Sequence, residues 1–175
     1  VGGEAFVYNS LAAISVGKLL NIPLAEIKEG IKKFELSKMR LDIQKTEQGY
    51  TIINDCYNAN YDSMKSAIEY LKNIERKIAV LGDMLELGEY SKELHGKVGL
   101  EVAKNKIDIL ITVGKEAENI ARVAKNNGIE DVYTFDNNKD ATEKLKKIIA
   151  VDDVALIKAS NSMNFKEIVE SLLKH

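Results

Sequence analysis

The sequence predicts an α/β protein in which a mostly parallel sheet carries helices on both faces and follows a short helical hairpin. Over most of the chain, short apolar runs alternate with longer stretches whose apolar residues recur at helical spacing. Short strands buried between helices are typical of parallel sheets joined by crossover helices, as in Rossmann-like domains. The first part of the chain has the helical pattern alone, which sets it apart from the sheet.

The first part is predicted to be two helices. Apolar residues recur at helical spacing from about Tyr8 to Leu20, and the segment Asn21-Ile22-Pro23 then interrupts the pattern. A second helix is predicted over residues 24–34. Residues 35–40 show no periodicity and are typical of a connector, so a domain boundary is predicted after residue 39.

Residues 40–175 contain the predicted sheet. Two short strand-like runs, 41–46 and 50–54, flank a predicted hairpin turn at residues 47–49. Further strands are predicted at residues 78–81, 109–113, 132–135 and 154–157. Helices are predicted at residues 63–73, 92–105, 115–127, 139–149 and 162–173. In such sheets, ligands bind beyond the carboxyl ends of the strands, so the residues that follow each run are the candidates for function.

Composition excludes several classes of protein. Lys and Arg total 25 against 27 for Asp and Glu, and a net charge of -2 gives no electrostatic reason to bind nucleic acid. The single cysteine, Cys56, cannot form an internal disulfide, and no apolar run is long enough to insert into a membrane. The chain begins with Val1 and shows no targeting signal. We therefore expect a cytoplasmic protein, and a monomer.

The chain lacks the common nucleotide-binding loops. Its Gly-Lys pairs, Gly17-Lys18, Gly96-Lys97 and Gly114-Lys115, do not fit the spacing of a phosphate-binding loop, and no Gly-x-Gly-x-x-Gly fingerprint is present. With two histidines and one cysteine, the chain has little material for a His/Cys metal site or a Cys-His nucleophile. His95 lies in a predicted helix, where a packing or surface role is favoured over catalysis.

A polar cluster, residues 54–63, follows the strand-like run 50–54 and leads into a helix. Its amide side chains could match an adenine edge, Tyr57 offers a stacking face, and a helix N-terminus favours an anion. The alternative is a simple turn in which Asp62 or Ser63 caps the helix. Composition alone leaves both interpretations open.

The core of this cluster reads Asp55-Cys56-Tyr57-Asn58-Ala59-Asn60-Tyr61-Asp62-Ser63-Met64. It resembles the Asp-x-Tyr-Asn-Ala-Asn-Pro-Asp-Ser motif of the Mur ligase family, in the branch that adds D-alanyl-D-alanine to a UDP-N-acetylmuramoyl tripeptide. Residues 7–13, 78–88 and 158–163 are similar to the same family in order and spacing. The resemblance covers the whole chain, with departures at Ala5, Phe6, Tyr61, Ala159 and Asn161.

The resemblance implies a reaction. Such ligases use ATP and Mg²⁺ to phosphorylate a carboxylate, and an amine then attacks the acyl phosphate. Residues 1–39 would be the tail of the central ATPase domain, and residues 40–175 the C-terminal domain that closes over the nucleotide and presents the amine. The phosphate-binding loop and the principal Mg²⁺ ligands would lie in the missing part of the ATPase domain. The chain alone is therefore expected to be inactive and to contain no catalytic residue or metal site of its own.

The resemblance also implies two sets of binding residues. Nucleotide contacts are expected from Asn9, Arg40, Asp55, Tyr57, Asn58 and Asn60. Arg40 would grip a phosphate, while Asp55 would accept from the ribose or pair with Arg40. Asp83 and Glu86 could receive the ammonium of D-alanyl-D-alanine. Lys158 and Ser160 could meet its carboxylate or the γ-phosphate, although Lys158 could equally pair with a neighbouring acid.

Two alternatives remain open from the sequence. A sister Mur ligase or a folylpolyglutamate-type ligase would accept a different amine. A free-standing module with a Rossmann-like sheet would bind a nucleotide or a protein without catalysis.

Overall fold

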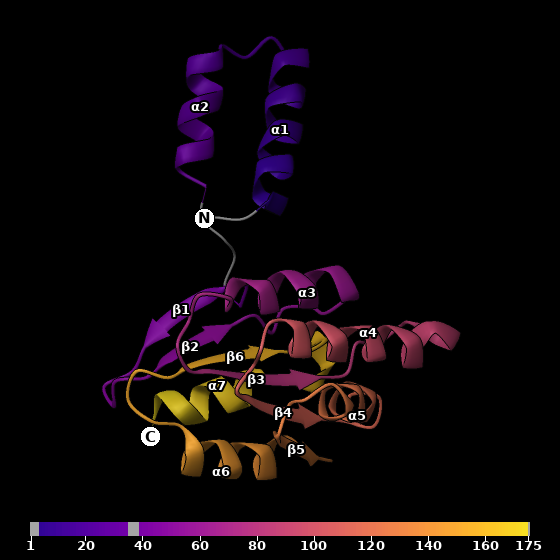
Figure 1. The fold of residues 1–175 in the computed structure, drawn as a ribbon. Helices are drawn as coiled ribbons and strands as arrows, with labels where there is room; N and C mark the ends of the chain where they lie inside the picture. Colours follow the sequence, from indigo (N-terminus) through magenta and orange to yellow (C-terminus); the bar gives the residue numbers. More distant parts are fainter. Residues whose placement is uncertain (1–3, 35–38, 175) are drawn as a thin grey trace. The chain divides into compact units, whose positions relative to one another are not determined.

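The computed structural model describes residues 4–34 and 39–174. Contacts divide the chain into two compact units, Val1–Ser37 and Lys38–His175. The first unit is helical and the second is the α/β domain (Figure 1). Each unit is described by itself.

The first unit is a hairpin of α1 (Glu4–Leu19) and α2 (Leu24–Lys32). Asn21 turns the chain with a φ of 57°, and Pro23 precedes α2, where its missing N–H removes no helical hydrogen bond. The helices meet closely at Gly17, where an added Cβ would lie 2.6 Å from Ile27 Cδ1. Taken by itself, the hairpin leaves most of its apolar side chains exposed, among them Val7, Tyr8, Leu11, Val16 and Leu19.

The second unit is built on a six-stranded sheet in the order β1-β2-β6-β3-β4-β5. The strands are β1 (Asp42–Lys45), β2 (Thr51–Asn54), β3 (Lys77–Gly82), β4 (Ile109–Val113), β5 (Asp131–Phe135) and β6 (Val154–Lys158). Only the pairing of β1 with β2 is antiparallel among these strands. The predicted fold class, a mostly parallel Rossmann-like α/β sheet, is confirmed.

Helices cover both faces of this sheet (Figure 1). They are α3 (Tyr61–Tyr70), α4 (Ser91–Lys104), α5 (Glu118–Asn126), α6 (Asn138–Ile148) and α7 (Lys166–Leu173). One core lies under α3, α4 and α5, and the other lies under α6 and α7. Alternate residues of β3 enter opposite cores: Ala79 and Leu81 face the first, while Ile78 and Val80 face the second. A strand buried on both faces explains why its sequence is a continuous apolar run.

Two helices begin later than the sequence predicts. The helix expected at residues 162–173 begins at Lys166, because Asn164 adopts a left-handed conformation with a φ of 53° after a short 3-10 turn, η2 (Asn161–Met163). The helix expected at residues 115–127 begins at Glu118, after Gly114 turns the chain with a φ of 107°. Both shifts fall beside strand ends, where loop geometry overrides helical periodicity.

The strand order creates a switch point between β3 and β6. From β3 the chain passes to β4 and β5 on one side, and it then returns to place β6 on the other side of β3. Ligands of doubly wound sheets bind beyond the carboxyl ends of strands at such a point. The loops that follow β2, β3 and β6 meet at this edge, which we call the carboxyl edge.

Candidate functional site

The candidate site lies on the carboxyl edge and is assembled from loops far apart in the sequence. The amide of Ser160, after β6, donates to the carbonyl of Asp83, after β3, at 3.1 Å and closes the switch point. Most of the residues predicted from the sequence lie at or after the end of a strand on this edge: Asp55, Tyr57, Asn58, Asn60, Asp83, Glu86, Lys158 and Ser160. Arg40 precedes β1 and contacts Tyr57, which lies on this edge. Asn9 is exposed on α1, in the other unit.

Lys158 and Asp55 form an enclosed ion pair on this edge. Lys158 Nζ lies 2.6 Å from Asp55 Oδ2, and the two side chains are 2% and 13% exposed. The ammonium also donates to the carbonyl of Asn58 at 2.9 Å and lies 3.5 Å from the carbonyl of Asp55. The sequence left open whether Lys158 pairs with a neighbouring acid, and in the structure it pairs with Asp55. The partner of Asp55 is therefore Lys158 and not Arg40.

Arg40 is held against the loop that follows β2. Its guanidinium carbon lies 4.1 Å from the centre of the Tyr57 ring, a cation–π arrangement. On either side of Arg40, the amide of Leu41 donates to Asp55 Oδ1 at 3.0 Å, and the carbonyl of Met39 accepts from the amide of Tyr57 at 3.1 Å. Arg40 is exposed and Tyr57 is 45% exposed, so a cation and an aromatic ring remain accessible together.

The two asparagines of the loop hold backbone groups. Asn60 is the N-cap of α3: its Oδ1 accepts from the amide of Ser63 at 2.9 Å, and its own amide donates to Ser63 Oγ at 3.0 Å. The helix is thus capped by Asn60, while Ser63 completes the capping box. Asn58 Oδ1 accepts from the amide of Ala59 at 2.8 Å. Both side chains are exposed, so structural hydrogen bonds and ligand contact are compatible at these positions.

Asp83 joins the loop after β3 to the start of α5. Its Oδ1 accepts from the amide of Ala117 at 2.7 Å, which satisfies a backbone donor at the helix N-terminus. The carboxylate also lies against Gly114, where an added Cβ would be 2.5 Å from Oδ1. Asp83 is buried, whereas Glu86 in the same loop is exposed and has a φ of 64°. Of these two acids, Glu86 is the one presented to solvent.

The same loop rests on Ser160 and on the buried His95. Ser160 Oγ accepts from the amide of Leu85 at 2.9 Å, and His95 Nε2 accepts from the amide of Met84, also at 2.9 Å. His95 Nδ1 lies 2.8 Å from the carbonyl of Ser91, which can only accept, so the proton sits on Nδ1 and Nε2 is free to accept. The sequence suggests packing for His95, but nothing in it indicates that this ring supports the loop that carries Asp83 and Glu86.

Cys56 is an inert thiol within the site. Burial first, and then the charge of Asp55, raises the pKa of Cys56 from 9.0 to about 12. Its Sγ lies 3.2 Å from the carbonyl of Ile157, to which the thiol donates. A protonated, buried thiol does not act as a nucleophile near neutral pH.

Comparison with known proteins assigns a family to this arrangement. Residues 39–161 match the family model described as "Mur ligase, glutamate ligase domain". This span holds each of the predicted site residues apart from Asn9. The chain belongs to the Mur ligase family.

The relatives of this Mur ligase chain are longer than the chain itself. The Bacillus subtilis UDP-N-acetylmuramoyl-tripeptide--D-alanyl-D-alanine ligase is 36% identical over 98% of this chain, which spans 38% of that protein. A crystal structure of MurF from Acinetobacter baumannii covers 99% of this chain at 26% identity with a TM-score of 0.85, and 38% of that chain is matched. The MurF ligase from Thermotoga maritima, solved in complex with ADP, covers 92% at 25% identity with a TM-score of 0.75, and 36% of it is matched.

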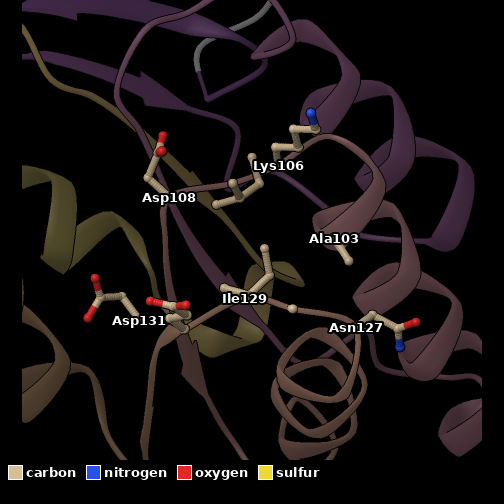
Figure 2. A pocket seen from close by; sticks show the side chains of 9 residues that line it. Ala103, Lys106, Asp108, Asn127, Ile129 and Asp131 are labelled. Atoms are coloured by element: carbon tan, nitrogen blue, oxygen red, sulfur yellow. The ribbon is translucent and has the colours of Figure 1, made fainter.

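A cavity of about 490 Å³ lies at the opposite edge of the Mur ligase sheet. Figure 2 shows it among residues from the ends of α4 and α5 and the starts of β4 and β5, including Lys106, Asp108, Ile129 and Asp131. Both helices end here with left-handed turns, at Lys106 with a φ of 51° and at Gly128 with a φ of 97°. The cavity therefore lies between the C-terminal ends of two helices, and none of the predicted site residues lines it.

Two further findings bear on cofactors and location. Within the part of the chain that the structure describes, no group of three or more His, Cys, Asp or Glu side chains is placed to hold a metal ion. Across residues 4–34 and 39–174, no helix has the length and apolar character needed to cross a membrane.

Proposed function

We propose that this chain is the C-terminal part of an ATP-dependent ligase that adds D-alanyl-D-alanine to UDP-N-acetylmuramoyl-tripeptide during peptidoglycan precursor synthesis. The enzyme would be a cytoplasmic monomer. The proposal is supported by a relative with this activity in its name that matches 98% of the chain. The observation that carries it is the accessible Arg40–Tyr57 pair beside the switch point of the sheet, where a nucleotide would bind.

Residues 1–39 would end the central ATPase domain, and residues 40–175 would form the C-terminal domain. The uncovered apolar face of the helical hairpin supports this division. Helices with wide apolar faces are normally buried within a larger core, and Val7, Leu11, Val16 and Leu19 have no such cover within the hairpin alone. We propose that the preceding residues of the ATPase domain provide that core.

Arg40 and Tyr57 would form the main nucleotide contact of this domain. A guanidinium donates two parallel hydrogen bonds to a phosphate and remains charged at all physiological pH values. The face of the Tyr57 ring would orient the guanidinium of Arg40. The exposed side-chain amides of Asn58 and Asn60 lie on the same loop and would contact the base or ribose. Asn9, in the helical hairpin, stays a predicted nucleotide contact, as the family resemblance implies.

The loop after β3 would receive the amine substrate. Glu86 is the exposed acid, suited to hold the ammonium of D-alanyl-D-alanine until it loses a proton and attacks. Asp83 contributes a second negative charge close by while it fixes the loop to α5. Ser160 accepts from the Leu85 amide through its Oγ, and the family resemblance implies that it also contacts the dipeptide carboxylate. Positioning and electrostatics of this kind account for most of the catalysis in such transfers.

ATP would supply the phosphoryl group that activates the tripeptide carboxylate. The family resemblance implies that the principal Mg²⁺ ligands lie in the ATPase domain, and we propose that this domain holds the metal. This chain would contribute the closing wall of the nucleotide site and the amine-binding loop. The isolated chain is expected to bind ATP weakly and not to hydrolyse it.

The reading frame that encodes the chain tests the proposal. It should extend upstream of Val1 and encode a Gly-Thr-x-Gly-Lys-Thr-like loop. The purified full-length product should release phosphate from ATP only when UDP-N-acetylmuramoyl-tripeptide and D-alanyl-D-alanine are both present. Preference for a single amino acid would point to a sister ligase, and preference for glutamate with a folate would point to the folylpolyglutamate type. Absence of the upstream loop would leave a binding module and refute the ligase.

A single substitution tests the nucleotide contact. Arg40→Ala in the full-length enzyme should lower kcat/KM for ATP by roughly tenfold or more, because a charge-assisted phosphate contact is lost. Arg122→Ala is the matched control, since Arg122 is exposed on α5 and bonds only within its helix to Asn119. Unchanged kinetics in Arg40→Ala would remove Arg40 from the site.

A further inference from the structure

The ammonium of Lys158 is enclosed, and the protein offers an acceptor for each of its three N–H donors. An ammonium has three N–H donors. Lys158 Nζ has three acceptors within reach, namely Asp55 Oδ2 at 2.6 Å, the Asn58 carbonyl at 2.9 Å and the Asp55 carbonyl at 3.5 Å. A ligand carboxylate or phosphate could bind Lys158 only by displacing one of these partners from a side chain that is 2% exposed.

Asp55 links Lys158 to the segment that carries Arg40. While Oδ2 is held by Lys158, Oδ1 accepts from the amide of Leu41. A second tie joins the carbonyl of Met39 to the amide of Tyr57, and the carbonyl of Tyr57 accepts from Asn161 Nδ2 at 3.1 Å. The segment around Arg40 is thus fastened on both sides to the loop that follows β2.

The backbone beside Arg40 needs such fastening. Met39 and Leu41 have φ values of 66° and 45°, a left-handed conformation that residues with a Cβ rarely adopt. Conformations of this kind persist only where the surroundings hold them in place. The hydrogen bond from the Leu41 amide to Asp55 and the bond from the Tyr57 amide to Met39 are the ties that the structure shows at these two residues.

We infer that Lys158 is a positioning residue for the nucleotide contact: it holds Asp55, and through Asp55 the Leu41 amide and Arg40. This inference rests on the proposed function and assigns Lys158 to the nucleotide half of the site. It replaces the role in binding the dipeptide or the γ-phosphate that the family resemblance implies.

Steady-state kinetics of the full-length enzyme separate the two roles. Lys158→Met keeps the bulk of the side chain and removes its charge. We expect the KM for ATP to rise by about tenfold or more while the KM for D-alanyl-D-alanine stays within about twofold. Lys166→Met, at an exposed lysine paired with Glu170 on α7, is the matched control and should leave both constants unchanged. A raised KM for the dipeptide with an unchanged KM for ATP would overturn the inference.

The double variant Asp55→Asn/Lys158→Met provides a rescue. It leaves no unpaired buried charge, and the carbonyl oxygen of an asparagine can still accept from the Leu41 amide. We expect it to fold even where Lys158→Met does not, and to have a lower KM for ATP than Lys158→Met. A double variant that fails to fold, that is as impaired as the single variant, or that has a raised KM for the dipeptide contradicts the inference.

A failure of the inference about Lys158 can be distinguished from a failure of the proposed substrate. A wild-type enzyme that ignores D-alanyl-D-alanine but uses another amine refutes the proposed substrate. The comparison of KM for ATP with KM for the amine is then made with the amine that the enzyme accepts.

Discussion

Gly114 and Gly128 offer a matched test of how tightly the site loops are joined. Both have positive φ values, 107° and 97°, so Ala should strain the backbone at both positions by a similar amount, about 1–3 kcal/mol. Their surroundings differ. An added Cβ at Gly128 meets nothing within 4 Å, whereas at Gly114 it would lie 2.5–2.6 Å from three atoms of the Asp83 carboxyl group.

The carboxylate of Asp83 cannot stay where it is in Gly114→Ala. Once displaced, it loses the hydrogen bond from the Ala117 amide, and a hydrogen bond to a charged group contributes about 1.5–3 kcal/mol. Gly114→Ala should therefore cost about 3–5 kcal/mol in the free energy of unfolding, against about 1–3 kcal/mol for Gly128→Ala. The excess of about 2 kcal/mol measures the link between the loops after β3 and β4.

Urea unfolding of the 175-residue chain, followed by far-UV circular dichroism, measures both losses. The wild type and both variants should share one m-value, so that the midpoints report stability alone. Asp83→Ala/Gly114→Ala adds a check when it is compared with Asp83→Ala, because without the carboxyl group the alanine at residue 114 has room, and only the backbone term should separate these two variants. Equal losses in Gly114→Ala and Gly128→Ala would refute the reasoning.

Three further predictions follow from single contacts. His95→Leu leaves the buried Met84 amide without its acceptor and should cost about 1–3 kcal/mol by thermal unfolding, whereas His95→Gln, which keeps an acceptor, should cost less; equal losses would contradict this role. Asn60→Ala removes the cap of α3 and should lower the free energy of unfolding by about 1 kcal/mol, measured by urea unfolding. Ser66→Ala, at an exposed position in the middle of the same helix, should change it very little. A larger loss in Ser66→Ala than in Asn60→Ala would contradict the capping role. The pKa of Cys56 is raised from 9.0 to about 12 in the folded state, so its contribution to stability is complete below pH 9.0 and is lost as the pH rises toward 12. The wild type should therefore lose more stability over this pH range than Cys56→Ala. Parallel profiles of stability against pH would refute the assignment.

Periodicity was enough to predict the layered α/β fold, because β3 and β4 are buried on both faces and most of their residues are apolar. It does not predict the strand order. Nothing local indicates that β6 inserts between β2 and β3, since this depends on long-range pairing between residues such as Ile53 and Leu156. The late start of α7 was also hidden, because the left-handed turn at Asn164 is set by its loop and not by the apolar spacing.

The sequence predicts where the candidate site lies, but it does not predict the partners of each side chain there. The rule that ligands bind at the carboxyl ends of strands selects the loops after β2, β3 and β6. The ion pair between Asp55 and Lys158 joins residues 103 positions apart, and no pattern in the sequence specifies it over a pair between Asp55 and Arg40. His95 lies on an unremarkable helical turn, and its acceptor role depends on where the Met84 amide happens to lie.

The polar residues of the carboxyl edge divide into two groups by burial. Asp55, Asp83 and Lys158 are largely enclosed and hold backbone amides, carbonyls or one another, so their loss should reduce stability and binding together. Arg40 and Glu86 are exposed, and substitutions there should reduce binding with little change in stability. A polar motif that resembles a ligand-binding sequence can therefore specify the scaffold of a site as much as its contacts. In this domain the enclosed charges hold the loops, and the exposed ones are those that we propose contact the nucleotide and the amine.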